Sequence, residues 1–500
     1  MQDTSRFTVS NLNFAPSFHW LGRRATLLAK NLTINHNQSR QRVALIKSIS
    51  GIRGTIGGKA GDNLTPQDIV ACTAGFGTLV LQSGAPSSVV IGRDARVSGE
   101  MVSHLVVQTL IAQGISVIDL GLSTTPTVEM AVTKLGAGAG IIITASHNPA
   151  QWNALKFLNQ KGEFISAADG EALLRFITAG DIEYAEFDQL GQYQRMDGMI
   201  EYHIEQILAL PLVDTEKVKN RRFKVVVDCI NSTGAISVPP LLEALGCEVI
   251  LLNGEPNGKF AHNPEPLPAH LEELCQKVRE SKADLGIAVD PDVDRLALVC
   301  EDGSLFGEEY TLVAVADYVL QNRVGNTVSN LSSSRALHDV TQQHGGAYFA
   351  AAVGEVNVVE KMKTVNAVIG GEGNGGIILP ELHYGRDALA GIALVLTHLA
   401  KAGKTLLELR QSYPQYQMIK DKITLTPSTD MARLLAKLQD KYAAENCNTI
   451  DGLKIDFAES WVHLRQSNTE PIIRIYAEAQ DAKTAQALAD AIKDAALMLL

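Results

Sequence analysis

From about residue 44 onward, short runs of apolar residues alternate with stretches in which apolar positions recur at helical spacing. Such runs are typical of buried strands, and such stretches are typical of amphipathic helices. Their alternation predicts an α/β architecture. The predicted strands are Ser88–Ile91, Ile115–Leu120, Ile141–Thr144, Phe223–Asp228, Cys247–Leu252, Asp284–Val289, Thr327–Leu331 and Ala367–Ile369, and the predicted helices are Val102–Ala112, Ala235–Leu245 and Leu271–Ser281.

The last block of the chain has a different order of elements, typical of an α+β layer. Its predicted strands are Ile419–Thr424, Gly452–Phe457, Trp461–Leu464 and Ile472–Ala477, and a long helix follows over Asp481–Leu500. Asp481 suits the start of that helix because its carboxylate can accept hydrogen bonds from the first turn. We therefore predict four domains, over residues 44–195, 196–304, 305–414 and 415–500.

Residues 1–43 differ from the rest of the chain. They are rich in Asn, Ser and Arg, and Asp3 is their only acidic residue. An Arg- and Ser-rich segment of this kind can be an organelle transit peptide, but it lacks the apolar core of a secretory signal. We favour an N-terminal extension without fixed structure, or translated sequence upstream of the true start.

Composition narrows the functional class. Hydrophobic residues make up 46% of the chain, which is enough to form buried cores. Lys and Arg number 44 and Asp and Glu number 55, so the net charge is 44 − 55 = −11. This balance argues against a nucleic-acid partner, which normally binds a basic face. It still permits an anionic small molecule held by a few arginines.

The cysteines and the most apolar stretch indicate a cytoplasmic protein without a membrane partner. The six cysteines include no CxxC pair and no spacing typical of a zinc site, so we expect free thiols in a reducing compartment. The most apolar stretch, Ala388–Ala400, is too short to span a bilayer and contains His398.

The first chemically suggestive loop, residues 144–149, follows the predicted strand Ile141–Thr144. Ser146 at such a bend is exposed and fixed in position, and its hydroxyl can carry a phosphoryl group when a cation offsets the charge. An ordinary polar turn with a buried His147 is equally compatible with these residues. A Ser/His/Asp hydrolase is a further alternative, but Gly-x-Ser-x-Gly is absent and adjacent Ser and His seldom face each other.

The second loop carries Asp290, Asp292 and Asp294 after a buried strand. Side chains at every second position lie on one side of an extended segment. Three carboxylates held together need a cation, and their oxygen atoms suit Mg²⁺.

An EF-hand is the main competing interpretation of this loop. The three aspartates would fill its positions 1, 3 and 5, and Glu301 would fill position 12. However, position 6 is Arg295 in place of the required Gly, and Leu296–Cys300 has the pattern of an apolar strand. We therefore reject the EF-hand.

The third loop, residues 370–376, is rich in glycine, which lets a ligand approach the backbone closely. Glu372 and Asn374 in this loop offer an acceptor and an amide that suit adjacent sugar hydroxyls. The loop is not a GxxxxGK[ST] phosphate loop, so nucleoside triphosphate binding is not indicated.

The fourth loop, residues 465–471, joins two predicted strands of the last block. Its guanidinium group, hydroxyls, amide and backbone N–H groups can surround a phosphate. A simple hairpin turn is the alternative.

Three smaller elements accompany these loops. Arg53 lies between two glycines, and Lys156 follows the serine loop and could transfer protons if it is desolvated. The segment Gly92–Gly99 is interpreted as a structural salt-bridge turn.

Together the loops resemble the α-D-phosphohexomutase superfamily, which includes phosphoglucomutase, phosphomannomutase and phosphoglucosamine mutase. The resemblance covers about residue 44 to the C-terminus, with every signature in the family's order. It implies an α/β fold of four domains around a central cleft. Three of these would be related mixed α/β domains, and the fourth a C-terminal α+β phosphate-binding domain.

The resemblance also implies roles for individual residues. Ser146 would be the phosphoserine, and one of its oxygens would complete a Mg²⁺ site formed by Asp290, Asp292 and Asp294. The implied catalytic residues are Ser146, His147, Lys156, Arg295 and Arg53, and the implied substrate-binding residues are Glu372, Asn374, Arg465, Ser467, Asn468 and Thr469.

The implied reaction moves a phosphoryl group between C6 and C1 of a hexose or hexosamine phosphate through a hexose 1,6-bisphosphate, which also acts as activator. The ending Asn374-Gly375-Gly376 and the following Gly-Arg-Asp look most like the archaeal-type phosphoglucosamine mutases. We therefore expect conversion of glucosamine 6-phosphate to glucosamine 1-phosphate by a monomer or homodimer. Phosphomannomutase or phosphoglucomutase activity is the alternative.

The chain departs from the family pattern in two loops. Gly376 stands where many relatives have a histidine thought to transfer protons, and His383 is a candidate replacement. Pro291 and Val293 stand where glycines and small residues are usual. Two other classes stay open, a phosphosugar hydrolase or synthase that uses Ser146 and Mg²⁺, and a sugar-phosphate-binding protein without catalysis.

Overall fold

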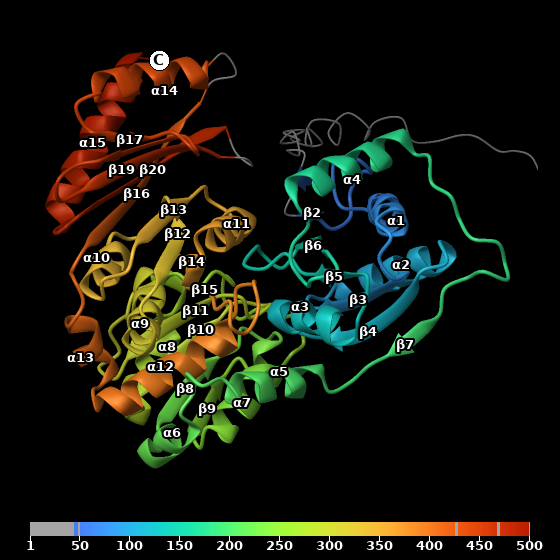
Figure 1. Ribbon diagram of the computed structural model, residues 1–500, viewed down its shortest axis with the longest axis horizontal. Helices are drawn as coiled ribbons and strands as arrows, with labels where there is room; N and C mark the ends of the chain where they lie inside the picture. Colours follow the sequence, from blue (N-terminus) through green and yellow to red (C-terminus); the bar gives the residue numbers. More distant parts are fainter. Residues whose placement is uncertain (1–44, 49–50, 426–428, 468–470, 500) are drawn as a thin grey trace, which may run out of the picture. The chain divides into compact units, whose positions relative to one another are not determined.

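The described chain forms four separate sheets (Figure 1). The structure is a computed structural model and describes residues 45–48, 51–425, 429–467 and 471–499. Three sheets mix parallel and antiparallel strands and the fourth is antiparallel, which confirms the predicted fold class. The predicted extension over residues 1–43 lies outside the described residues, and the predicted domain boundaries remain predictions.

The first sheet has seven strands in the order β1-β2-β6-β5-β3-β4-β7. Its strands are β1 (Ile46–Ser48), β2 (Gly51–Thr55), β3 (Ser88–Arg93), β4 (Ser116–Leu122), β5 (Ala139–Ile143), β6 (Trp152–Leu158) and β7 (Tyr193–Arg195). The accompanying helices are α1 (Pro66–Gln82), α2 (Gly99–Ala112), α3 (Thr125–Lys134) and α4 (Ala167–Ala179).

The second and third sheets have four strands each, in the orders β11-β10-β8-β9 and β13-β12-β14-β15. The second unit contains β8 (Lys224–Asp228), β9 (Glu248–Leu252), β10 (Leu285–Val289), β11 (Leu296–Cys300), α5 (Met199–Leu208), α6 (Thr215–Arg221), α7 (Gly234–Ala244), η1 (Pro268–His270) and α8 (Glu272–Ser281). The third contains β12 (Asn326–Asn330), β13 (Tyr348–Ala351), β14 (Ala367–Glu372), β15 (Gly376–Ile378), α9 (Glu308–Asn322), α10 (Ala336–Gln343), α11 (Glu355–Val365), α12 (Ala388–Ala402) and α13 (Leu406–Gln411).

The same four-strand topology occurs in the first three units. In each, two consecutive strands pair in parallel, the third strand pairs in parallel with the first, and the fourth returns antiparallel to the third. The four strands are β3 to β6 in the first unit, β8 to β11 in the second and β12 to β15 in the third. Each unit therefore has one tight connection between its third and fourth strands.

The fourth sheet is antiparallel, in the order β16-β20-β19-β18-β17. Its elements are β16 (Gln417–Thr424), β17 (Asn446–Asn448), β18 (Leu453–Asp456), β19 (Trp461–Gln466), β20 (Ile472–Ala479), α14 (Met431–Lys441) and α15 (Ala482–Leu499). Asp481 caps α15 as predicted, because its Oδ1 accepts a hydrogen bond from Thr484 N at 2.9 Å.

Every strand and helix named from the sequence is present and lies within three residues of its predicted bounds. The predictions omitted β6, which has seven residues, and β15. β6 carries Asn153 and Lys156 among its apolar residues, and β15 is only three residues long, so neither has a clear apolar pattern.

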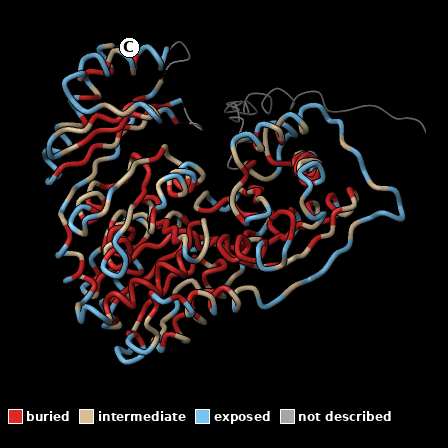
Figure 2. The backbone as a smooth tube through the Cα atoms, viewed as in Figure 1, coloured by how far each residue is buried: buried red, intermediate tan, exposed pale blue. Residues whose placement is uncertain are grey.

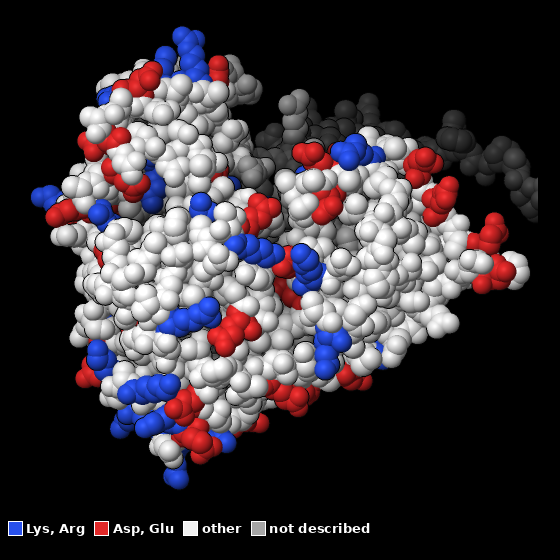
Figure 3. Space-filling view, in the orientation of Figure 1, with Lys and Arg blue, Asp and Glu red and all other residues white. Residues whose placement is uncertain are grey.

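The apolar stretch that begins at Ala388 forms α12, which is buried from Ala388 to Leu399 (Figure 2). It belongs to one hydrophobic core shared by the second and third units. None of the helices within the described ranges is long and apolar enough to cross a membrane. On the face drawn in Figure 3, basic and acidic side chains are interspersed.

We expect Leu394→Ala to lower the free energy of unfolding by about 2–5 kcal/mol, because it leaves a cavity in the shared core. Leu394 is fully buried in α12. Leu497→Ala is the matched control, since Leu497 in α15 is 50% exposed and its loss should change stability by less than about 0.5 kcal/mol. Urea unfolding measures both, and equal effects would contradict the central role assigned to α12.

Candidate active site

Three of the four chemically suggestive loops occupy the same position in the three repeated units. Each is the connection between the third strand and the antiparallel fourth strand: β5 to β6 for Ser146, β10 to β11 for the aspartates, and β14 to β15 for the glycine-rich loop. Hydrogen bonds bring these connections together. Ser146 Oγ donates to Asp290 Oδ2 at 2.7 Å, and Leu296 N donates to Gly375 O at 3.0 Å.

The backbone at Ser146 has a left-handed conformation, with φ of +49°. Residues other than glycine adopt this conformation rarely, and it is enriched at functional sites where surrounding contacts enforce it. One such contact is the hydrogen bond from Ser146 N to Thr144 Oγ1 at 2.9 Å. The serine is only 7% exposed, so the predicted exposure is wrong, because the contacts that fix the turn also bury it and hold its hydroxyl at one point inside the site.

Arg96 fixes the loop that carries Ser146 through hydrogen bonds to its backbone. Its guanidinium pairs with Asp94 at 2.9 Å, and both side chains are fully buried. The same guanidinium donates to the backbone carbonyls of four loop residues, Ser146 (2.5 Å), Asn148 (2.7 Å), Pro149 (2.8 Å) and Trp152 (3.0 Å). The predicted salt-bridge turn over Gly92–Gly99 is thus confirmed, and it shapes the loop that carries Ser146.

His147 faces Ser146, and the expectation that the two side chains would point apart is wrong. Nδ1 of His147 lies 3.3 Å from Ser146 Oγ, because the left-handed turn at Ser146 brings both side chains to one side. Burial lowers the pKa of His147 well below its ordinary value, and Arg295 lowers it further, so the imidazole is neutral. Its Nε2 lies 4.0 Å from Glu265, too far for the hydrogen bond of a Ser/His/acid triad.

The three aspartates converge because the chain turns. Val293 has a φ of +62° and its N–H donates to Asp290 O at 3.1 Å, so the segment is a turn and the predicted extended conformation is wrong. Asp290 Oδ1 accepts hydrogen bonds from the backbone N–H groups of Asp294 and Arg295, both at 3.1 Å. The three carboxylates are fully buried, and each offers an oxygen within 4.8 Å of the others.

The aspartates have the properties of a site for a hard divalent cation. Within the described part of the chain, Oδ1 of Asp292 and Oδ1 of Asp294 have no hydrogen-bond partner. Burial raises the pKa of Asp290 well above its ordinary value, and Asp294 and Asp292 raise it further. Three carboxylates that lie close together and offer oxygen atoms without hydrogen-bond partners fit Mg²⁺. The next residues, Leu296–Cys300, form the buried strand β11, which confirms the rejection of an EF-hand.

Lys156 lies against the aspartates. Its Nζ is 2.8 Å from Asp292 Oδ2 and 3.5 Å from Asp294 Oδ2. Burial alone would lower the pKa of Lys156, but Asp292 and Asp294 raise it above its ordinary value, so the amine is charged. Thr125 Oγ1, at the start of α3, donates to the same Asp292 oxygen at 2.6 Å.

Two predicted arginines flank this cluster. Arg295 Nη1 lies 3.6 Å from Glu265 Oε1 and its Nε lies 3.9 Å from Asp294 Oδ1. Arg53 pairs across β2 and β6 with Ala154, two residues before Lys156, so alternation places Arg53 and Lys156 on the same face of the sheet. Burial lowers the pKa of Arg53, and Arg474 lowers it further.

Both predicted sugar-binding residues lie together in the glycine-rich loop. Glu372 is 5% exposed, and its Oε1 accepts from Asn330 Nδ2 at 2.9 Å and from Gly354 N at 3.2 Å. Asn374 Nδ2 lies 3.4 Å from the other oxygen of Glu372, and Asn374 Oδ1 accepts from Gly376 N at 3.2 Å. The loop therefore holds a carboxylate and an amide side by side.

Arg386 is the principal site residue that the sequence analysis missed. Its guanidinium binds three buried carboxylates from different segments, Asp294 at 2.7 Å, Glu372 at 2.9 Å and Glu355 at 3.1 Å. It thereby joins the aspartate loop to the glycine-rich loop.

Arg386 also occupies the space beside Gly376. A Cβ on residue 376 would lie 2.3 Å from Arg386 Cδ, so a side chain at this position collides with the arginine. The glycine is needed for space, because its φ lies outside the left-handed region. His383, the candidate replacement, lies elsewhere, 3.2 Å from both Glu129 and Asp387. The sequence did contain a signal for Arg386: Gly376 has no side chain, and Gly385-Arg386-Asp387 follows it.

The fourth loop lies in the fourth unit. Arg465 Nε donates to Asp451 Oδ2 at 2.7 Å, and that oxygen also accepts from Val353 N at 3.0 Å. Val353 immediately precedes Gly354, which donates to Glu372, so a chain of contacts links Arg465 to the glycine-rich loop. Ser467 is 6% exposed, while the predicted phosphate-binding residues Asn468 and Thr469 lie outside the described residues.

Comparison with protein families gives matches along most of the chain. The models described as phosphoglucomutase/phosphomannomutase, alpha/beta/alpha domains I, II and III, match residues 45–183, 201–303 and 307–416. The model of the phosphoglucomutase/phosphomannomutase C-terminal domain matches residues 423–495.

Individual proteins agree with these matches. A "Phosphoglucomutase/phosphomannomutase" of Thermococcus kodakarensis is 36% identical over 440 residues, which cover 87% of this chain and 95% of the relative. A "Probable phosphoglucosamine mutase" of Methanopyrus kandleri is 34% identical over 450 residues, which cover 89% and 96%. A crystal structure of a phosphoglucomutase/phosphomannomutase family protein from Burkholderia thailandensis has a TM-score of 0.79 at 26% identity and covers 92% of this chain and 97% of its own.

We expect Arg96→Lys to lower the free energy of unfolding by about 1.5–3 kcal/mol, because an ammonium cannot replace all the charge-assisted hydrogen bonds that the guanidinium donates to the loop. Urea unfolding measures the loss. Hydrogen exchange should also show faster exchange at the amides of residues 144–149.

Arg175→Lys is the matched control for this experiment, since Arg175 is exposed on α4. It should leave stability and exchange unchanged. Slow exchange of the serine loop in the Arg96→Lys protein would show that other contacts shape the loop.

Proposed function

The chain belongs to the phosphoglucomutase/phosphomannomutase family and is a phosphohexomutase, and on that premise we propose that it converts glucosamine 6-phosphate to glucosamine 1-phosphate through a phosphoserine at Ser146. The observation that carries this proposal is the position of Ser146 Oγ, 2.7 Å from a buried aspartate and 3.3 Å from a neutral imidazole. A nucleophile that repeatedly gains and loses a phosphoryl group needs a proton acceptor beside it, and His147 lies in that position.

In the first step the phosphoserine donates its phosphoryl group. The Oγ–P bond of Ser146 breaks as a sugar hydroxyl oxygen bonds to phosphorus, which gives a hexose 1,6-bisphosphate. The hydroxyl proton passes to a base, for which Lys156 is in place once its aspartate partners are neutralised. Ser146 Oγ takes a proton from His147 as its bond to phosphorus breaks, and this leaves the imidazole neutral. The bisphosphate then reorients and returns its other phosphate to Ser146 Oγ. In this return step His147 takes the serine proton back, and Lys156 gives its proton to the sugar oxygen that leaves. The bisphosphate therefore also serves as activator.

The transferring group carries negative charge, and the surrounding side chains offset it. Asp290, Asp292 and Asp294 would hold Mg²⁺ with a phosphoserine oxygen, and the ion would withdraw charge from the phosphoryl group. Arg295 and Arg53 add fixed positive charge beside it. Water must be excluded during reorientation, because it would hydrolyse the phosphoserine.

The remaining predicted residues bind the parts of the substrate that do not react. Glu372 and Asn374 would hold two adjacent sugar hydroxyls through a carboxylate and an amide that already lie 3.4 Å apart. Arg465, Ser467, Asn468 and Thr469 would hold the phosphate that is not transferred. In this assignment the fourth loop binds one phosphate of the bisphosphate while the other phosphate lies at Ser146. The two phosphates exchange these positions when the bisphosphate reorients.

The choice of amino sugar follows from the relatives. The Methanopyrus kandleri protein is named a probable phosphoglucosamine mutase, and the alignment with this chain covers 96% of its length. Mannose or glucose phosphates are the second candidate substrates, which the name of the Thermococcus kodakarensis relative favours.

We expect purified protein to carry phosphate on the peptide that contains Ser146, and this phosphate to exchange with glucosamine 6-phosphate in the presence of Mg²⁺. Intact and peptide mass spectrometry measure the modification. Coupled assays with glucosamine, mannose and glucose 6-phosphates then rank the substrates by kcat/KM, and we expect the amino sugar to rank first. Much faster turnover of mannose 6-phosphate would overturn the substrate proposal and leave the phosphoserine intact.

Ser146→Ala should remove both the phosphate and the turnover, whereas Ser87→Ala should retain them, because Ser87 lies on the surface outside the site. Free phosphate as the main product would support the hydrolase alternative. A protein that stays unmodified after incubation with hexose 1,6-bisphosphate and Mg²⁺ would support the binding-protein alternative.

We expect Arg386→Lys to lower kcat/KM by about 10- to 100-fold, because a lysine cannot bind Asp294, Glu372 and Glu355 together. Loss of charge-assisted hydrogen bonds worth about 1.5–3 kcal/mol corresponds to this range. Steady-state kinetics measure the change. Arg410→Lys serves as control, since Arg410 donates to Phe306 O in a different part of the third unit.

Arg386 occupies the space that a side chain at residue 376 would need. Variants at the two positions, made singly and together, therefore test this steric relation. Gly376→His alone should nearly abolish turnover, because the new side chain collides with Arg386. Adding Arg386→Ala should restore part of the turnover. Equal activity of the Gly376→His variant and the double variant would refute the proposed collision between a side chain at residue 376 and Arg386.

A further inference from the structure

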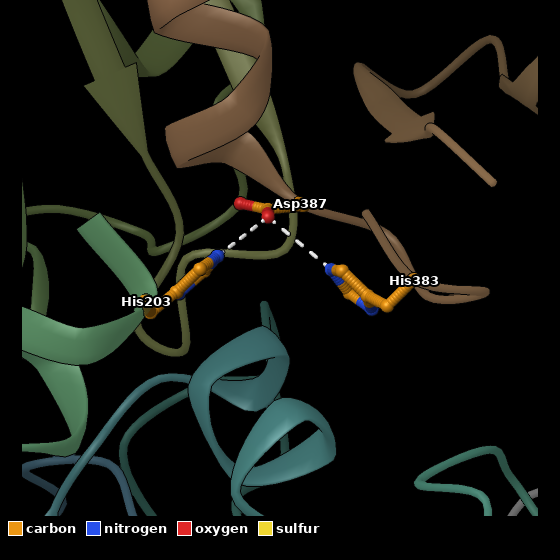
Figure 4. Close-up of side chains that lie close together, drawn as sticks. All are labelled: His203, His383 and Asp387. Carbon is orange, nitrogen blue, oxygen red and sulfur yellow. Dashed lines mark hydrogen bonds and ion pairs between the residues drawn. The ribbon is translucent and has the colours of Figure 1, made fainter. Parts of the chain in front are cut away.

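A second cluster of metal-binding side chains lies apart from the aspartates and contains His203, His383 and Asp387 (Figure 4). Both imidazoles direct Nε2 at the same carboxylate oxygen, Asp387 Oδ2, at 2.8 Å from His203 and 3.2 Å from His383. All three ligand atoms lie within 4.8 Å of one another. The other oxygen of Asp387 accepts from Leu389 N and Ala390 N and caps α12, so Oδ2 is the oxygen directed at the histidines.

Each imidazole also has an acceptor at its other nitrogen. Thr127 Oγ1 lies 3.0 Å from His203 Nδ1, and Glu129 Oε2 lies 3.2 Å from His383 Nδ1. Histidines that bind a metal through one nitrogen usually donate the other N–H to a carboxylate, carbonyl or similar acceptor, which fixes the ring. The ring of His203 has this form, and His383 Nδ1 faces Glu129 at ion-pair distance without the alignment of a hydrogen bond.

Glu129 is a buried carboxylate that lies 3.2 Å from His383 Nδ1. It is 2% exposed, and neither of its carboxylate oxygens makes a well-aligned hydrogen bond with any described residue. A buried carboxylate without aligned donors is costly unless positive charge lies nearby. A cavity of about 500 Å³, lined by Glu129, His383, Tyr202 and Tyr384, adjoins this carboxylate.

We propose that His203, His383 and Asp387 bind a zinc ion, with water as the fourth ligand. Two imidazole nitrogens and one carboxylate oxygen match the ligands that Zn²⁺ prefers, whereas the three aspartates of the candidate active site match Mg²⁺. Zinc between the two Nε2 atoms and Asp387 Oδ2 leaves each Nδ1–H to donate to Thr127 or Glu129.

The position of this site indicates what the ion does. His203 belongs to α5 of the second unit, His383 and Asp387 to the third, and the supporting Thr127 and Glu129 to α3 of the first. Asp387 adjoins Arg386, which binds Asp294. A zinc ion here would tie three units together next to the segment that joins the aspartate and glycine-rich loops, and it would be a structural ion without contact to the substrate.

The test counts zinc bound to the full-length protein. Protein equilibrated with Zn²⁺ is dialysed against excess Mg²⁺, and the metal is measured by mass spectrometry. We expect one zinc per chain in the wild type and in a double variant, Asp290→Asn with Asp292→Asn, that removes the oxygen site. His203→Gln and His383→Gln should each retain none, and His344→Gln should retain zinc, because His344 pairs with Asp317 outside the cluster.

Glu129→Gln keeps both histidines and the carboxylate, so it tests the site in a protein of nearly unchanged shape. We expect its zinc affinity to fall by about 10- to 100-fold, as for loss of a group that orients a ligating histidine. Cobalt in place of zinc should give the visible absorption of a tetrahedral nitrogen and oxygen site. Absence of zinc from the wild type, retention in both histidine variants, or loss in the aspartate variant would overturn the proposal.

Discussion

Mutual repulsion among three buried carboxylates is the constraint that organises this protein. Two like charges about 4 Å apart repel by about 4 kcal/mol at an effective dielectric constant of about 20, and Asp290, Asp292 and Asp294 add burial to that cost. Side chains of the first and third units donate hydrogen bonds to these carboxylates. Ser146 donates to Asp290, Lys156 to Asp292 and Arg386 to Asp294, each at 2.7–2.8 Å. The negative charge of the aspartates therefore accounts for the positions of Ser146, Lys156 and Arg386 around them.

The repeated topology explains why these donors can reach the carboxylates. In each of the first three units the functional loop joins the third strand to the antiparallel fourth, so the same local geometry serves a serine, a set of aspartates and a sugar-binding pair. A tight connection between adjacent strands holds side chains more precisely than a long loop. Positive φ angles at Ser146, Val293 and Gly375 sharpen the three turns.

Much of this organisation could be predicted from the sequence, and the failures have physical causes. Strands such as β8 and β10 are continuous apolar runs, so their pattern is unambiguous, and the loops that follow them could be placed. The contact between Ser146 and His147 depends on a left-handed serine, a conformation that residue type alone disfavours. Arg386 meets Asp294 across 92 positions of sequence, and periodicity carries no information at that range.

Arg386 has a chemical consequence for the whole site. An arginine stays protonated at any physiological pH, so it supplies charge and hydrogen bonds but cannot transfer a proton. The side chain that fills the space beside Gly376 is therefore a fixed cation. Proton transfer falls to the titratable groups near the reacting atoms, His147 beside Ser146 Oγ and Lys156 beside Asp292. Because the aspartates hold the pKa of Lys156 high, its capacity to accept a proton depends on how completely a bound cation neutralises them. Proton transfer and metal binding are therefore coupled in this site.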